Sequence, residues 1–229
     1  IRRQRQMCIR DRLYGMYPDV INNFGAEYEI LKNLVSSYLY KDILALAGIR
    51  KSEVLEKILR ALAMQVGSEV SYNEIAQLVG VDKNTVNNYI DLLEKSFVIF
   101  RLTSFSKNIR NEIKANKKIY FYDNGVLNML IGNFNSLALR QDKGALWENF
   151  LVSERMKQLS FSQSTSKPYF WRTTTQQEID YVETNADAVS AFEFKWASIK
   201  KAKLPKSFIE AYQPCFLVVN QENFREFLK

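Results

Sequence analysis

The spacing of the apolar residues changes along this chain, and that change constrains its fold more than any other feature. As far as about Ser96, apolar residues recur at the spacing of helix faces, as in Val54, Ile58 and Leu62. From Gly144 onward, one helical segment is followed by three β-rich segments, a short helix and a final apolar strand. The sequence therefore predicts a mainly helical part followed by a mixed α/β part.

Residues 49–132 carry the element order of a winged helix-turn-helix. Helices are predicted over residues 53–66, 72–78 and 83–96, with Ser71 and Asp82 as N-caps. Strands are predicted over 97–105 and 118–122, joined by a basic polar loop. Two helices, a tight turn, a third helix and a β-hairpin are typical of the winged helix.

Polar side chains on the third helix and on the hairpin loop are candidate nucleic-acid contacts. Asparagine pairs with adenine, and lysine reaches guanine or phosphate. The candidates are Lys83, Asn84, Asn87 and Asn88 on the helix and Lys107, Arg110, Lys114, Lys117 and Lys118 on the loop. Protein docking is the alternative, because winged helices serve that role as well and a polar outer face is ordinary for a surface helix.

An acid–lysine pattern in the last third points to phosphodiester chemistry. Asp180 lies on one predicted strand, Glu193 and Lys195 lie two residues apart on the next, and Glu148 lies on the preceding helix. Asp180 and Glu193 would bind a hard cation, Mg²⁺ or Mn²⁺, and Glu148 would complete its shell. The cation would activate water and polarise the phosphate, while Lys195 would orient the water or stabilise negative charge. The alternative is an ordinary exposed strand face, since Glu112-Ile113-Lys114 repeats the Glu-x-Lys spacing in a polar loop.

Composition narrows the chemistry further. The 229 residues include no histidine and two cysteines, which excludes histidine-dependent catalysis, four-cysteine zinc sites and a disulfide framework. No phosphate-binding P-loop sequence occurs, and no apolar run is long enough to span a membrane, so we expect a cytoplasmic protein. The net charge of +7 favours a nucleic-acid partner. The sequence does not determine the oligomeric state.

The first twelve residues contribute much of that charge. Residues 1–12 contain five arginines and one aspartate, and the stretch Gln6 to Asp11 resembles the translation of a sequencing adapter. We therefore expect residues 1–12 to be non-native or disordered, with a native basic arm as the alternative. Without them, 27 basic and 24 acidic residues remain, and the argument for nucleic acid depends on local basic clusters. One such cluster is the run Lys195, Lys200, Lys201, Lys203 and Lys206.

As a series, the motifs resemble the C-terminal region of prokaryotic AAA-type ATP-binding proteins that end in a domain of unknown function. The matching stretches are Tyr14 to Val20, Tyr38 to Ile43, Ala61 to Gly67, Asn84 to Ile90, Lys118 to Gly125, Gly144 to Asn149, Phe170 to Arg172, Glu178 to Asp180 and Glu193 to Lys195. The resemblance implies an α/β (α+β) chain, with the tail of an ATPase lid over 13–48, the winged helix over 49–132 and a PD-(D/E)XK nuclease-like domain over 133–229.

The resemblance also implies which activities the chain has and lacks. ATP would bind only in a preceding ATPase domain, which would then be a partner of this region alongside DNA. The leading hypothesis is a DNA-binding, metal-dependent nuclease-like module. The alternative is a non-catalytic regulatory or protein-docking region that controls the ATPase.

Overall fold

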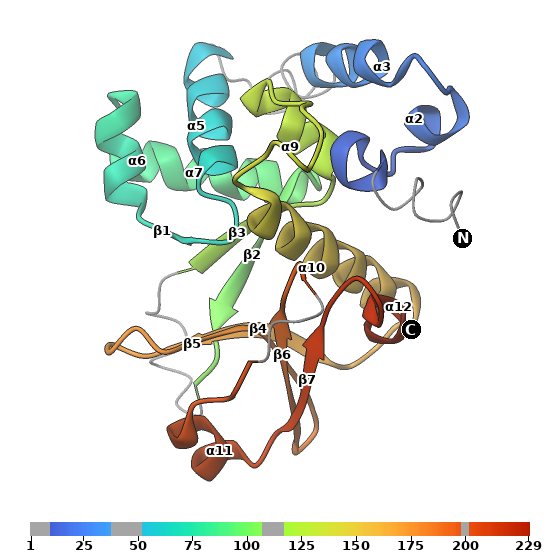
Figure 1. Ribbon diagram of the computed structural model, residues 1–229. Coiled ribbons are helices and arrows are strands. Elements are labelled where there is room, and N and C mark those ends of the chain that lie inside the picture. The colour runs from blue at the N-terminus through green and yellow to red at the C-terminus, as the bar shows by residue number, and fades with distance from the viewer. Residues whose placement is uncertain (1–9, 38–51, 107–116, 198–201) are drawn as a thin grey trace. The chain divides into compact units, whose positions relative to one another are not determined.

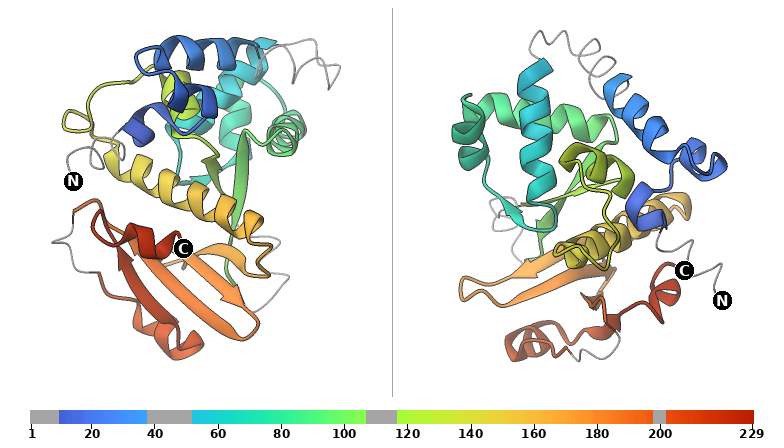
Figure 2. Two further views of the ribbon diagram at one scale, coloured as in Figure 1. Left: turned by 90° about the vertical axis from the view of Figure 1, so that its right-hand side faces the viewer. Right: turned by 45° about the horizontal axis from the view of Figure 1, so that its top comes forward.

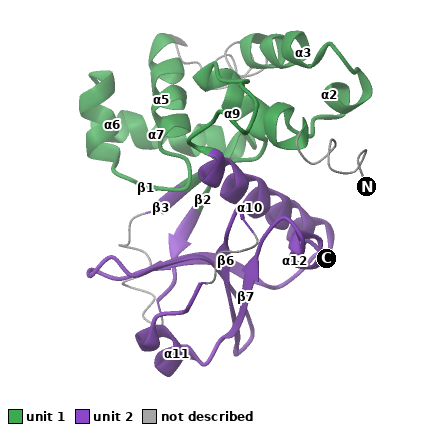
Figure 3. Cartoon of the chain, viewed as in Figure 1, with its two compact units in different colours: residues 1–101, 119–142 green, residues 102–118, 143–229 purple. Residues whose placement is uncertain are grey.

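The computed structural model describes residues 10–37, 52–106, 117–197 and 202–229. The chain forms two compact units, residues 1–101 with 119–142 and residues 102–118 with 143–229 (Figure 3). The sequence groups residues 102–118 with the winged helix. In the structure they lie in the second unit, because Thr103 and Ser104 pair in parallel with Tyr169 and Phe170.

The first unit is mainly helical (Figure 1). Its described elements are α2 (Pro18–Asn22), α3 (Glu27–Asn33), α5 (Ser52–Met64), β1 (Glu69–Val70), α6 (Tyr72–Val79), α7 (Lys83–Lys95) and α9 (Asn124–Ile131). Helix α3 ends at Asn33 and is followed by a π-helical turn over residues 34–37, and residues 38–51 lie outside the described part. In the described ranges, no helix has both the length and the apolar composition that crossing a bilayer requires.

Local capping explains where the helices of the first unit begin and end. Ser71 caps α6 by accepting a bond from the Glu74 amide, and Asp82 caps α7 by accepting one from the Thr85 amide. Gly80 ends α6 in the left-handed conformation, which glycine adopts without strain. These caps confirm the sequence prediction. So does the buried stripe of α7, made of Val86, Tyr89, Ile90 and Leu93.

A second set of bonds joins the start of the described chain to the N-terminus of α9. The Asp123 carboxylate accepts from the Val126 amide at 3.0 Å and from the Met16 amide at 2.7 Å. A Cβ atom on Gly15 would lie 2.0 Å from that carboxylate, so only glycine fits there. Asp123 therefore acts both as helix cap and as anchor for the preceding turn.

Residues 10–12 take part in the same packing. Arg10 forms an ion pair with Glu27 at 3.0 Å, and the Arg12 carbonyl accepts bonds from Asn124 and Asn128, both at 3.2 Å. Residues 10–12 belong to the segment 1–12 that the sequence predicts to be non-native or disordered, yet Arg12 is buried, as are Asn124 and Asn128 that bond to its carbonyl.

Within the described residues, the strands join in one mixed seven-stranded sheet with the hydrogen-bonded order β1-β3-β2-β4-β5-β6-β7. The fold is therefore mixed α/β. Strand β4 pairs antiparallel with β5 and β5 antiparallel with β6, whereas β6 pairs in parallel with β7. The strands other than β1 are β2 (Ile99–Ser104), β3 (Lys117–Phe121), β4 (Lys167–Arg172), β5 (Glu178–Asn185), β6 (Ala188–Phe194) and β7 (Cys215–Val219).

Helices cover both faces of strands β4 to β7 in the second unit (Figure 2). On one face Phe208, from α11 (Lys206–Tyr212), packs against Trp171 with ring centroids 4.9 Å apart. On the other face lie α10 (Lys143–Phe161) and α12 (Phe224–Phe227), and Phe227 contacts Phe192 at 4.8 Å. Trp196 meets Trp147 of α10 on this same side. The sequence predicts all of these elements except α12.

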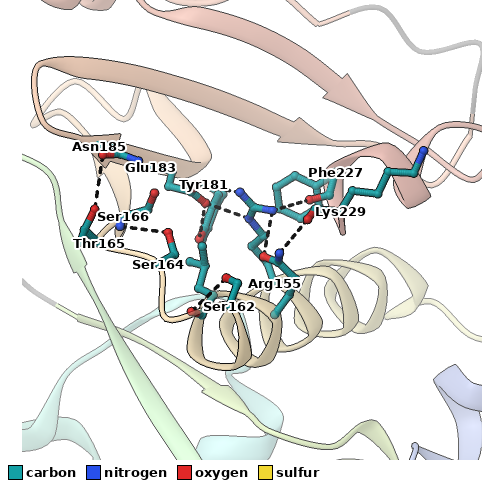
Figure 4. A network of polar contacts seen from close by, with 12 residues as sticks. Arg155, Ser162, Ser164, Thr165, Ser166, Tyr181, Glu183, Asn185, Phe227 and Lys229 are labelled. Carbon is teal, nitrogen blue, oxygen red and sulfur yellow. Dashed lines mark hydrogen bonds and ion pairs between the residues drawn. The ribbon is translucent and has the colours of Figure 1, made fainter.

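A largely buried ion pair links α10 to the sheet and to α12 (Figure 4). Arg155 of α10 donates two bonds to the Glu183 carboxylate, at 2.8 and 2.9 Å, and a third to the Phe227 carbonyl at 3.0 Å. The Tyr181 hydroxyl donates to the same carboxylate at 3.2 Å. This Arg155 cluster (Arg155, Tyr181, Glu183) has one base, one acid and fork geometry, which is the arrangement of a structural ion pair.

Candidate active site

The sheet brings Asp180 and Glu193 together. In the antiparallel pair of β5 and β6, Tyr181 lies opposite Phe192, and continuing this register by one residue places Asp180 opposite Glu193. The Asp180 carboxylate also accepts a bond from the Phe194 amide, with Oδ2 2.7 Å from the nitrogen. Asp180 is therefore held against the backbone of the strand that carries Glu193.

Lys195 completes this arrangement directly after β6. Its backbone amide donates to the Val219 carbonyl at 2.9 Å, which extends the pairing with β7 by one residue. Its ammonium lies 2.6 Å from Glu193 Oε1. Both side chains keep some solvent exposure, 28% for Lys195 and 19% for Glu193, so the pair is accessible to a ligand.

The electrostatics show that four of the candidate residues share one neighbourhood. Burial and the nearby Glu193 carboxylate raise the pKa of Asp180 to about 6. Burial lowers the pKa of Lys195, but its bond to Glu193 and the charges of Glu193, Asp180 and Glu148 raise it further than burial lowers it. The sum is a raised pKa, so Lys195 stays charged among three acids.

Two further residues, Lys118 and Glu178, belong to this site, although the sequence pattern predicted neither of them there. Lys118, predicted from the sequence to lie on the exposed basic loop, is only 1% exposed. Its ammonium forms ion pairs with Glu178 Oε1 at 2.5 Å and with Glu148 Oε1 at 3.2 Å. Burial lowers the pKa of Lys118, but the charges of Glu148 and Glu178 more than compensate and raise it. The sequence did contain one indication that Lys118 is buried, since it directly precedes the apolar run Ile119-Tyr120-Phe121.

All of these side chains lie in the second unit. We refer to them as the acid–lysine cluster: Lys118, Glu148, Glu178, Asp180, Glu193 and Lys195. Arg172 adds a contact of 3.7 Å to Glu178. The cluster thus places four carboxylates next to two lysines and one arginine.

Asp180 and Glu193 suit a divalent cation in chemical kind. Both supply hard oxygen donors from neighbouring strands, and Mg²⁺ is often bound by one or two carboxylates, with water and phosphate oxygens as its other ligands. A third acid is not gathered with them: within the described residues, no set of three or more acids, cysteines or histidines has the geometry of a metal site. The residues present therefore fit a cation held by two carboxylates.

The candidate nucleic-acid residues of α7 have different surroundings. Lys83, Asn84 and Asn88 are exposed on the helix. Asn87 instead donates to Asp91 at 3.1 Å, and Asp91 pairs with Arg101 at 2.8 Å. Lys107, Arg110 and Lys114 lie outside the described residues, and Lys117 is half-buried at the start of β3. In the described part of the chain, the exposed candidates are therefore those at one face of α7.

Two family matches together cover most of the chain. Residues 9–137 match the domain of unknown function DUF8612, and residues 143–228 match the domain of unknown function DUF4143. The acid–lysine cluster draws on both matches, since Lys118 lies in the first and the other five members lie in the second. No solved structure matches the chain.

Curated relatives of the chain include uncharacterized proteins from two bacteria and an archaeon. One from Mycobacterium tuberculosis is 32% identical over 153 residues, which cover 65% of this chain and 34% of that protein. One from Haemophilus influenzae is 25% identical over 184 residues, covering 77% and 42%. One from Methanocaldococcus jannaschii is 23% identical over 176 residues, covering 74% and 37%. The matched region thus spans between a third and a half of these relatives.

Proposed function

The chain belongs to the family of the domain of unknown function DUF8612, and from its site we propose that the second unit is a PD-(D/E)XK-type module that cleaves phosphodiester bonds of DNA with Mg²⁺ or Mn²⁺. One observation carries the proposal. The Asp180 carboxylate is bonded to the Phe194 amide, which places it beside the Glu193-x-Lys195 pair. Two acids and a lysine on adjacent strands are the groups that such chemistry requires.

Each residue has a distinct task in this proposal. Asp180 and Glu193 hold the divalent cation, which when bound supplies the Lewis acidity that polarises the phosphate. Lys195 leaves its ion pair with Glu193 and donates to a phosphate oxygen on which negative charge develops. Its raised pKa keeps it a cation for this role.

A cleavage assay with matched variants tests the proposal. We expect the chain to cut DNA in the presence of Mn²⁺ or Mg²⁺, and Lys195→Ala to lower the rate by about 10²–10³-fold. Lys167→Ala, which removes an exposed lysine at the start of β4, is the control and should leave the rate unchanged. Equal cleavage by wild type and Lys195→Ala, or no cleavage with either cation, would refute the catalytic proposal.

We further propose that the first unit is a winged helix that binds DNA through α7, within an AAA-type ATP-binding protein. The exposed side chains Lys83, Asn84 and Asn88 support this role. Lys83→Ala should weaken DNA binding and reduce the slope of log affinity against log salt concentration by about one. Lys95→Ala, at the other end of α7, is the control and should leave both unchanged. If Lys83→Ala shows the same dependence of affinity on salt concentration as Lys95→Ala, this face of α7 does not contact DNA.

A non-catalytic regulatory role is the second candidate, and the ion pairs of the cluster favour it. Glu148 and Glu178 contact Lys118, and Glu193 contacts Lys195. Carboxylates that each form an ion pair with a lysine are typical of an ion-pair network that stabilises a fold. This candidate predicts that Lys195→Ala changes ATPase activity of the longer protein and that no nuclease activity is present.

A further inference from the structure

Lys118 is the most deeply buried cation in the acid–lysine cluster. It lies on β3, 1% exposed, and its ammonium is 3.2 Å from Glu148 and 2.5 Å from Glu178. The ring of Phe170 lies beneath it, 5.4 Å from the ammonium to the ring centroid. An ammonium removed from water in this way is stable only next to compensating carboxylates.

Glu148 is therefore already neutralised by a cation that belongs to the chain. Glu148 could bind a metal ion only if its ion pair with Lys118 were broken, and the buried ammonium would then have fewer carboxylate partners. Within the described residues, no three acids approach one another closely enough to hold a metal. Both observations separate Glu148 from the pair Asp180 and Glu193.

We propose that Lys118 is the resident cation of Glu148, so that Glu148 positions this ammonium and does not bind the metal ion. The inference rests on the proposed function for its metal site at Asp180 and Glu193. It changes the role of Glu148 that the sequence pattern suggested. The inference also means that the site in the DUF4143 region is completed by Lys118, a residue that lies outside that region and within the DUF8612 match.

Calorimetric titration of the whole chain with Mn²⁺ tests the inference without relying on activity. Asp180→Asn should weaken Mn²⁺ binding by roughly tenfold or more, since it removes a ligand charge. Glu148→Gln should leave the affinity within about twofold, because Lys118 still pairs with Glu178. If Glu148→Gln weakens binding as much as Asp180→Asn does, Glu148 is a ligand and the inference is wrong.

Removing the ammonium provides the reciprocal test. Lys118→Met frees Glu148, so we expect Mn²⁺ to bind roughly tenfold more tightly, and the added substitution Glu148→Gln should abolish the gain. Lys118→Met/Glu178→Gln takes the place of the single variant if circular dichroism shows that Lys118→Met does not fold. Unchanged Mn²⁺ affinity in the folded variant would overturn the inference.

The outcomes also separate this inference from the proposed function. If the wild type binds no Mn²⁺ but Lys118→Met does, the metal part of the proposed function fails and the role of Lys118 is supported. If the wild type binds Mn²⁺ through Asp180 and Lys118→Met binds it no better, the proposed function stands and the inference fails. If neither protein binds Mn²⁺, both fail.

Discussion

The second unit contains two clusters of charged side chains, and they differ in how their charges are balanced. In the Arg155 cluster, one arginine meets one glutamate through two parallel bonds, and Tyr181 supplies a third donor to the same carboxylate. In the acid–lysine cluster, four carboxylates share two lysines and a more distant arginine. The first has one acid and one base, whereas the second has two more carboxylates than lysines, or one more carboxylate than cations when Arg172 is counted.

This difference has consequences for the individual acids. Glu183 is fixed by the planar guanidinium, whose geometry matches a carboxylate. The Asp180 carboxylate instead accepts a bond from an uncharged donor, the Phe194 amide, and lies beside the Glu193 carboxylate. Its pKa is accordingly raised to about 6. One cluster stabilises the fold, and the other carries unfavourable charge that a bound cation would relieve.

The largest expected effect comes from breaking the balanced cluster. Arg155→Met leaves Glu183 buried without its cation, so we expect it to reduce the free energy of unfolding by about 3–5 kcal/mol in urea denaturation. Lys157→Met is the control on the same helix, since the partly exposed pair of Lys157 with Glu154 is worth at most about 0.5 kcal/mol. A loss of less than about 1 kcal/mol for Arg155→Met would show that the cluster does not stabilise the fold.

The next effect has the opposite sign. The pKa of Asp180 is raised from 3.8 to about 6, so the folded protein binds this proton more tightly than the unfolded chain. The unfavourable contribution of the charged Asp180 is absent below about pH 4 and fully present above about pH 6. Asp180→Asn should therefore raise the free energy of unfolding at pH 8 by about 1–3 kcal/mol and have little effect near pH 4.

This measurement needs a metal chelator in the buffer and a control for the lost charge. Asp187→Asn removes a charge of the same sign from the exposed turn between β5 and β6, and we expect little change at either pH. If Asp180→Asn were destabilising at pH 8, Asp180 would be a structural acid like Glu183. The distinction between the two clusters would then be lost.

The sequence predicted the parts of the fold that depend on local signals. The caps Ser71 and Asp82 lie within three residues of the amides that they bind, so their roles can be read from a short stretch. The strand order and the two-residue period likewise predicted that Asp180, Glu193 and Lys195 would meet. Helix α12 was missed because its four residues are defined by distant contacts, such as that of Phe227 with Phe192.

The partners of a buried lysine cannot be predicted in the same way. Lys118 and Glu148 are 30 residues apart, and the apolar run that follows Lys118 indicates burial but does not identify its partners. The pairing of β2 with β4 and the packing of Phe105 against Phe208 are tertiary contacts that place residues 102–118 with the second unit. The residue that most changes the interpretation of the site is therefore one that local patterns assign to another surface.

The smallest expected effect on stability is at Lys195. Its pair with Glu193 is half-exposed and lies at the end of β6, so Lys195→Ala should change the free energy of unfolding by about 1 kcal/mol or less. The same substitution should abolish most DNA cleavage if the cluster is catalytic. A large loss of activity with little loss of stability, measured on one preparation by cleavage assay and urea denaturation, would distinguish Lys195 from Arg155. A residue retained for catalysis need not stabilise the folded state. A stability loss near that of Arg155→Met would therefore mean that Lys195, like Arg155, serves the fold.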